Sequence, residues 1–306
     1  MTELKKTLIK TGKIETELKY SIPYESKAVI LIVHGMMEHS KRYSILADFI
    51  LENSLGYACF DLPGHGIKEL NSGQLGNWPE KGFEICADII SDIVEFLKEK
   101  HGKPVIILGH SMGAFLTIKV ISEQGHKFKG CILSGTNDMD SIIFLKAGII
   151  LASIVSFFKG SDYKSSLLYN MAFGSFNNKI NPVRTKFDWL TRDEERVDNY
   201  INDSSCGFTA SARMFLELAK MMMEIFKREN IDSIPDELPI LIFSGEKDPV
   251  GKYGTGPVKF RDRLKASGKR NVALKLYSDA RHECINEINR DEVFLDIIRF
   301  CKEIAF

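Results

Sequence analysis

Short apolar runs alternate with longer segments of helical periodicity along most of this 306-residue chain. Residues 4–10 and 15–22 alternate between apolar and polar side chains around a Thr-Gly-Lys turn, which predicts an antiparallel hairpin. Continuous apolar runs predict six further strands, at residues 28–35, 57–61, 104–111, 130–136, 238–248 and 272–280. Helical periodicity predicts helices between them, over residues 42–53, 82–100, 112–124, 257–267 and 291–303. This alternation predicts an α/β fold, in which helices cover both faces of a mostly parallel sheet.

The alternation stops between residues 137 and 237, where the sequence is helical in character and is broken near three glycines and one proline. Strand and helix units resume at residue 238, so this block is an insertion after the sixth predicted strand. We therefore expect a core domain made of residues 1–136 and 238–306, with a helical cap over residues 137–237.

The most apolar window of the chain lies inside the expected cap, at residues 142–158. It has 17 residues and includes Lys146, whereas a helix that spans a membrane needs about 20 apolar residues. We expect a buried or interfacial helix here.

Composition excludes some classes of partner. The 41 basic and 41 acidic residues cancel, so the chain offers no positive field for nucleic acid, and we expect no nucleic-acid partner. The first twenty residues contain no uninterrupted apolar stretch, so we expect no cleavable signal peptide. The six cysteines are scattered, with no CxxC pair and no histidine nearby at ligand spacing. This pattern is typical of free thiols in a reducing cytoplasm, and we expect neither a disulfide framework nor a metal site.

The strongest chemical motif is Gly-His-Ser-Met-Gly at residues 109–113, between a predicted strand and a predicted helix. In this G-x-S-x-G context the serine occupies a sharp turn that exposes its hydroxyl above the sheet, and the glycines permit close packing. The alternative is a tight turn without chemistry. We predict that Ser111 is a nucleophile.

A nucleophilic serine needs a base to accept its proton and an acidic residue to orient that base. On this kind of fold the chain order is serine, then aspartate or glutamate, then histidine. Asp248 follows the strand predicted at 238–248, and His282, alone among the seven histidines, follows the last predicted strand. Asp138 is the alternative acid, because it follows the strand at 130–136; we favour Asp248 as the orienting residue.

Ester or amide hydrolysis also needs N–H donors for the oxyanion that forms on the carbonyl. The backbone N–H of Met112, directly after the nucleophile, is one expected donor. The other is expected from the loop after the strand at 28–35, and we assign it to the N–H of Met36. Met36 and Met37 could equally be ordinary apolar loop residues, and the two roles are compatible.

Five motifs together resemble one family. They are HGMMEHS (34–40), DLPGHG (61–66), GHSMG (109–113), SGEKDPV (244–250) and RHECINE (281–287). Their order and spacing resemble the monoglyceride lipase and lysophospholipase branch of the α/β-hydrolases. The resemblance implies the eight-stranded α/β-hydrolase sheet, with Ser111 as nucleophile, His282 as general base and then acid, and Asp248 as orienting carboxylate. It also places the oxyanion donor of the first loop on Met36. The cap matches only in position and helical character, so acyl preference does not carry over.

The remaining charged residues of these motifs are interpreted as braces. We expect His65 and Asp61 to hold their loop rather than contact substrate, and Glu38 and Glu287 to tie loops together through hydrogen bonds. Unpaired burial of such groups would be costly.

The expected cap holds 9 of the 20 phenylalanines and 6 of the 10 methionines. Flexible thioethers suit variable apolar ligands, although a small cap also needs a core of its own. We expect Met37, Phe144, Phe157 and Phe158 to contact substrate, and the window 142–158 to line an acyl tunnel or contact a lipid surface.

These expectations combine into a cytoplasmic serine hydrolase that cleaves monoacylglycerol or lysophospholipid esters through an acyl-enzyme, with transient membrane contact through the cap. No metal or organic cofactor is expected. One alternative is an aminopeptidase or amidase whose substrate amine binds the acidic run at residues 193–195; another is a catalytically silent binding protein. Serine at the elbow, where aspartate would be needed, argues against haloalkane dehalogenase and epoxide hydrolase chemistry.

Overall fold

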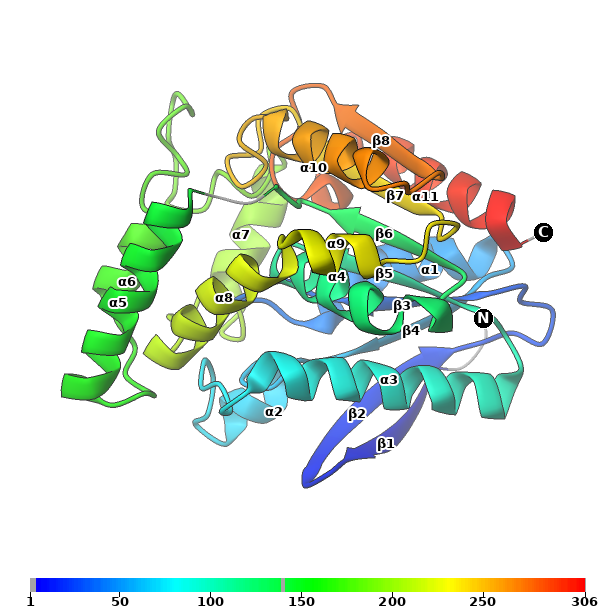
Figure 1. Ribbon diagram of the computed structural model, residues 1–306, viewed down its shortest axis with the longest axis horizontal. Coiled ribbons are helices and arrows are strands. Elements are labelled where there is room, and N and C mark those ends of the chain that lie inside the picture. The colour runs from blue at the N-terminus through cyan, green and yellow to red at the C-terminus, as the bar shows by residue number, and fades with distance from the viewer. Residues whose placement is uncertain (1–3, 139–140, 306) are drawn as a thin grey trace.

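The computed structural model describes residues 4–138 and 141–305 and is built around one eight-stranded sheet (Figure 1). The strand order is β1-β2-β4-β3-β5-β6-β7-β8. The strands are β1 (Lys5–Thr11), β2 (Ile14–Ser21), β3 (Val29–Val33), β4 (Gly56–Phe60), β5 (Val105–His110), β6 (Gly130–Ser134), β7 (Ile240–Gly245) and β8 (Val272–Tyr277). Strand β2 pairs antiparallel with β1 and β4, and every other pairing is parallel. The expected hairpin and mostly parallel sheet are confirmed.

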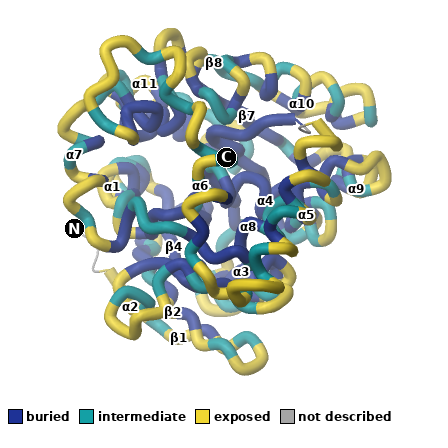
Figure 2. Tube along the Cα trace, turned by 90° about the vertical axis from the view of Figure 1, so that its left-hand side faces the viewer, coloured by how far each residue is buried: buried dark blue, intermediate teal, exposed yellow. Residues whose placement is uncertain are grey.

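Helices cover both faces of the sheet, as the buried side chains of β3 demonstrate. Val29, Leu31 and Val33 belong to a core shared with α3 (Gly82–His101), α4 (Met112–Gln124) and α10 (Thr255–Ala266). Ile30 and Ile32 belong to a second core, shared with α1 (Ser44–Glu52) and α11 (Arg290–Ala305). A strand buried on both faces has no polar side, which explains its continuous apolar run. Figure 2 shows the interior strands β4 and β7 buried, in contrast to the exposed tip of the β1–β2 hairpin.

One short helix, α2 (Gly66–Asn71), was not expected from the sequence pattern. Its six residues bury only Gly66, so it has no apolar stripe from which a helical period could be recognised.

Five helices of the described chain lie between β6 and β7. They are α5 (Ile142–Lys159), α6 (Ser166–Phe173), α7 (Glu194–Asn202), α8 (Ala212–Ile225) and α9 (Arg228–Ser233). Helix α8 packs against α5 on one side and against α3 and α4 on the other, so it connects the outlying α5 to the sheet layers (Figure 1).

Helix α5 coincides with the apolar window and lies largely at the surface. It buries only Leu145, Gly148 and Ala152, and the side chains of Ile143 and Phe157 are 80% and 83% exposed. By length and composition alone, α5 is apolar enough to cross a membrane. Of the two expectations for this window, a buried helix is wrong, because the three buried residues of α5 all lie on one side of the helix and the rest of it is partly or fully exposed. The expectation of an interfacial helix stays a prediction.

Candidate active site

The predicted nucleophile occupies the turn between β5 and α4. Ser111 has a φ of 53° and a ψ of −120°, a strained combination for a residue with a side chain, of the kind that concentrates at functional sites. A Cβ atom on Gly113 would lie 2.3 Å from the carbonyl oxygen of Val33, and one on Gly109 would lie 2.4 Å from that of Gly113. The two glycines therefore allow α4 to approach β3 and β5 closely enough to form the turn.

The two other predicted triad members are in contact. His282 Nδ1 lies 3.0 Å from Asp248 Oδ1, and both side chains are buried. Asp248 also accepts hydrogen bonds from the backbone N–H of Val250 (2.8 Å) and the hydroxyl of Ser244 (3.1 Å). Burial alone would raise the pKa of Asp248, but the charge of His282 and these hydrogen bonds lower it below its usual value. Burial opposes the charged imidazolium, yet Asp248 raises the pKa of His282 above the ordinary histidine value.

Asp138, the alternative acid, is occupied elsewhere. Its Oδ2 accepts a hydrogen bond from Arg263 Nη2 at 3.0 Å. Asp248 is therefore the acid that the structure brings to His282, although both aspartates follow neighbouring strands.

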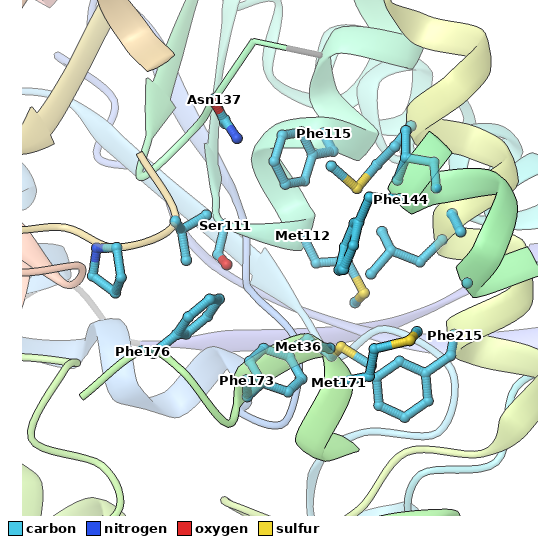
Figure 3. A pocket seen from close by; sticks show the side chains of 18 of the residues that line it. Met36, Ser111, Met112, Phe115, Asn137, Phe144, Met171, Phe173, Phe176 and Phe215 are labelled. Carbon is cyan, nitrogen blue, oxygen red and sulfur yellow. The ribbon is translucent and has the colours of Figure 1, made fainter. Parts of the chain in front are cut away.

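An apolar cavity of about 310 Å³ opens at Ser111 (Figure 3). The predicted oxyanion residues Met36 and Met112 line it together with Phe144 from α5. Most of the other lining residues are phenylalanine, leucine or methionine, namely Phe115, Leu145, Leu168, Met171, Phe173, Phe176, Phe215, Leu218 and Met222. The N–H of Met112 is one of the first in α4, where donors have no acceptor inside the helix.

Two predicted substrate contacts need correction. Phe157 and Phe158 do not line this cavity; they lie near the carboxyl end of α5, 83% and 74% exposed. Phe144 lies nearly four turns earlier on the same helix, and only that end of α5 lines the cavity at Ser111. The periodicity of the window could not reveal which end faces the core, because nearly all of its residues are apolar.

A much smaller cavity, of about 20 Å³, also borders Ser111. His282 and Met37 line it, together with Tyr200 and two acidic residues, Glu38 and Glu283, and several apolar side chains. Met37 thus borders this small cavity rather than the large apolar one. Ser111 and Met36 border both cavities.

A buried ion network supports the loop that carries Met36. In this oxyanion loop, residues 34–39, Glu38 Oε1 accepts the N–H of Gly35 at 2.6 Å. Arg42 donates to Glu38 at 2.6 Å and to both carboxylate oxygens of Glu283 at 2.6 and 2.7 Å. Burial would raise the pKa of Glu38, but the charge of Arg42, the nearby histidines His110 and His34 and the Gly35 N–H together lower it to about 2. Arg42 and Glu283 were missed by the sequence analysis, because 241 positions separate them.

The motif residues expected to brace loops do so. Asp61 accepts the N–H of Ser40 at 2.8 Å, and His65 Nδ1 contacts the carbonyl of Pro63 at 2.8 Å. Glu287 accepts hydrogen bonds from the backbone of Arg281 and from the backbone and guanidinium of Arg192.

Comparison with known proteins identifies the family. The model of the family described as serine aminopeptidase, S33, matches residues 24–289, which include every residue of the predicted triad and oxyanion hole. The chain belongs to this family. It is an α/β-hydrolase of the monoglyceride lipase-like branch.

Two of the relatives of this serine aminopeptidase family member are named as lipid hydrolases. It is 32% identical to human monoglyceride lipase over 86% of this chain and 77% of that protein. It is 26% identical to the phospholipase YtpA of Bacillus subtilis over 87% of this chain and 92% of that protein. It spans only 26% of an uncharacterized abhydrolase domain-containing protein of Dictyostelium discoideum, at 24% identity over 90% of this chain. A solved thermostable carboxyl esterase from Bacillus coagulans, in complex with glycerol, superposes with a TM-score of 0.91 and 26% identity over the whole of both chains.

The description of the family as serine aminopeptidases agrees with the aminopeptidase alternative, in which the acidic run at residues 193–195 would bind the substrate amine. The structure shows where this run lies. Asp193 caps α7 by accepting the N–H of Arg196 and contacts Arg290 at 3.3 Å. Glu194 and Glu195 lie in the first turn of α7, and none of the three residues lines either cavity at Ser111. In this family member, the acidic run serves a helix terminus.

Proposed function

We propose that the chain is a carboxylic ester hydrolase that cleaves lipid esters of the monoacylglycerol type through an acyl-enzyme on Ser111. The observation that carries the proposal is the position of Ser111 between two unlike spaces. The large one is apolar and suits an acyl chain, and the small one is bordered by His282 and by two acidic residues as well as by apolar side chains. The named activities of the human, Bacillus subtilis and Bacillus coagulans relatives support ester hydrolysis.

In the proposed mechanism, His282 uses Nε2 to take the proton of Ser111 as its oxygen attacks the ester carbonyl. The N–H groups of Met36 and Met112 stabilise the oxyanion. Asp248 holds Nδ1 of His282 and stabilises the imidazolium. The alcohol leaves with the proton from His282, and water then releases the fatty acid with the roles reversed.

The charges around the small cavity favour an uncharged alcohol as the leaving group. Its volume of about 20 Å³ is close to that of a single water site, so it can hold one hydroxyl and not a whole glycerol molecule. Glu38 and Glu283 on its walls share one cation, Arg42, and their remaining negative charge would repel the phosphate of a lysophospholipid. A glycerol leaving group is neutral and avoids this repulsion. The lysophospholipid alternative rests on the phospholipase name of the Bacillus subtilis relative.

We further propose that residues 137–237 act as a cap over the catalytic core, and that the exposed face of α5 contacts a membrane surface. Ile143, Ile150, Phe157 and Phe158 are each more than 60% exposed. An exposed apolar helix beside an apolar cavity suits an enzyme that takes its substrate from a lipid surface. This assignment fits a cytoplasmic enzyme in peripheral contact with a membrane.

A substrate profile of the purified protein tests the proposal. We expect hydrolysis of p-nitrophenyl esters and monoacylglycerols, weaker hydrolysis of lysophospholipids and none of aminoacyl amides. A serine-reactive phosphonate should label the wild type and not Ser111→Ala, which should fold normally and lose ester hydrolysis. Substantial turnover by Ser111→Ala would refute the acyl-enzyme, and a preference for amides would favour the aminopeptidase reading.

A further inference from the structure

A second cluster of chemically versatile side chains lies outside the elbow, where the oxyanion loop meets the residues that follow α7. His39 Nε2 is 2.8 Å from Asp203 Oδ2. Ligand atoms of His39, Asp203 and Cys206 all lie within 4.8 Å of one another. Imidazole nitrogen, carboxylate oxygen and cysteine sulfur are the donors of zinc sites, where they bind at about 2.0–2.3 Å. Three atoms within 4.8 Å of one another are close enough together to share one ion.

The sulfur of this cluster lacks a protein partner. Cys206 is 9% exposed, and its Sγ takes part in no hydrogen bond within residues 4–138 and 141–305. Its backbone N–H donates to the carbonyl of Asp203 at 2.9 Å, which holds the two residues in one tight turn. A buried sulfur within 4.8 Å of an imidazole nitrogen and a carboxylate oxygen is a donor set that a borderline cation such as Zn²⁺ accepts.

The local charge favours a cation. The charge of Arg42 acts on Cys206, but its guanidinium is paired with Glu38 at 2.6 Å and with Glu283 at 2.6 and 2.7 Å. Asp203 adds a third carboxylate to this one guanidinium. A divalent ion would therefore enter a region of excess negative charge. The side chain of Asp203 is 37% exposed, which gives an ion a route from solvent.

The cluster joins two segments that border the candidate active site. The N–H of Gly207 and the hydroxyl of Tyr200 both donate to the carbonyl of Met37, at 3.0 and 2.9 Å. These bonds already tie the end of α7 and the following turn to the oxyanion loop. An ion held by His39 on one side and by Asp203 and Cys206 on the other would add a third, stronger connection.

We propose that His39, Asp203 and Cys206 bind a divalent cation of the zinc class, which links the oxyanion loop to the residues after α7. The cysteine releases its proton to solvent when it binds, the histidine binds as neutral imidazole, and water completes the coordination. Sequence spacing predicted no metal site because 164 positions separate His39 from Asp203. The site does not depend on the proposed ester hydrolase activity, and its test measures metal binding directly.

Cobalt titration of the full-length, reduced and metal-free protein tests the site. We expect one Co²⁺ to bind with a thiolate-to-cobalt charge-transfer band, and Zn²⁺ to displace it. Cys206→Ser should abolish the band. Asp203→Asn keeps the size of the side chain and an oxygen for the N–H of Ser205, and it should weaken Co²⁺ binding at least about tenfold. Cys301→Ala, which removes a buried thiol from α11, is the matched control and should bind as the wild type does.

Thermal unfolding provides a second readout. Zn²⁺ should raise the Tm of the wild type and of Cys301→Ala, because it binds the folded state, and it should leave the Tm of Cys206→Ser unchanged. The proposal is overturned if no charge-transfer band forms, or if the band persists in Cys206→Ser. If Cys206→Ser fails to fold, Asp203→Asn decides, since undiminished affinity in that variant would exclude the site.

Discussion

The buried network at the oxyanion loop allows a quantitative test through Glu38. Its side chain is 4% exposed. Oε1 accepts the Gly35 N–H at 2.6 Å and the Tyr43 hydroxyl at 2.9 Å, and Oε2 accepts from Arg42 at 2.6 Å. In Glu38→Gln, the remaining oxygen can keep the first two bonds, while the new amide N–H₂ faces a guanidinium that can only donate.

The expected loss of stability in Glu38→Gln follows from this one unfavourable contact between two donors. A hydrogen bond to a charged group contributes about 1.5–3 kcal/mol, and breaking a buried ion pair costs about 3–5 kcal/mol. Arg42 keeps both hydrogen bonds to Glu283. The loss of stability should therefore be smaller than the cost of leaving a buried charge without any partner. We expect Glu38→Gln to lower the free energy of unfolding by about 2–4 kcal/mol at pH 7.

Urea denaturation followed by linear extrapolation measures this loss. The pKa of Glu38 is about 2 in the folded protein, below its ordinary value of 4.5. The contribution of the carboxylate to stability is therefore complete above the unfolded pKa and is lost as the pH falls towards 2. The difference between wild type and Glu38→Gln should shrink as the pH falls from about 5 to about 2.

Kinetics separate the ion pair from the oxyanion loop. Glu38→Ala also removes the acceptor of the Gly35 N–H, so it should lower kcat at least about tenfold, whereas Glu38→Gln should affect kcat less. Complete loss of an oxyanion donor costs about 10²–10³ in kcat. Glu95→Gln, at an exposed pair with Lys127, is the control and should leave stability and activity unchanged. Equal stability of Glu38→Gln and wild type would refute this account of the network.

Three further predictions test the elbow, the histidine and α5. Gly113→Ala should unfold at lower urea concentration and lose activity, because its Cβ would meet backbone oxygens of β3 and the loop after it at 2.3 and 2.5 Å; wild-type activity would contradict the packing argument. The pH profile of kcat/KM should have its acid limb above the ordinary histidine pKa of 6.5, because Asp248 raises the pKa of His282 despite burial. Asp248→Asn should move that midpoint to lower pH, and an unmoved midpoint would argue against the pair. Phe157→Ser should reduce vesicle binding in co-sedimentation and leave p-nitrophenyl acetate hydrolysis unchanged, whereas Phe144→Ala should selectively slow long-chain esters; the reverse pattern would exchange their roles.

Local sequence patterns were sufficient to predict most of the helices and strands, because each element depends mainly on residues that are close together in the chain. The run at residues 28–35 indicated a strand buried on both faces, and β3 is in contact with helices on both sides. The turn at Ser111 was predictable because its glycines are adjacent in sequence to the strand and helix that need them. Helix α2 escaped prediction for the opposite reason, since it buries too little to leave a pattern.

Side chains from distant segments could not be predicted in the same way. Trp189 lies between α6 and α7, yet its ring centroid is 5.1 Å from that of His282, and its carbonyl accepts the His282 N–H. No spacing rule connects residues 189 and 282, because their contact depends on how the inserted helices fold back over the sheet.

The sequence by itself determined the strand order along the chain, the position of the elbow and the candidates for the triad, because these depend on periodicity and on short motifs. Tertiary structure alone decided which end of α5 faces Ser111 and that Arg42 lies between two carboxylates. It also brought His39 to Asp203 and Cys206. The physical reason is that the burial of apolar side chains follows the periodicity of neighbouring residues along the chain. The pairing of buried polar groups instead depends on which distant segments the fold brings together.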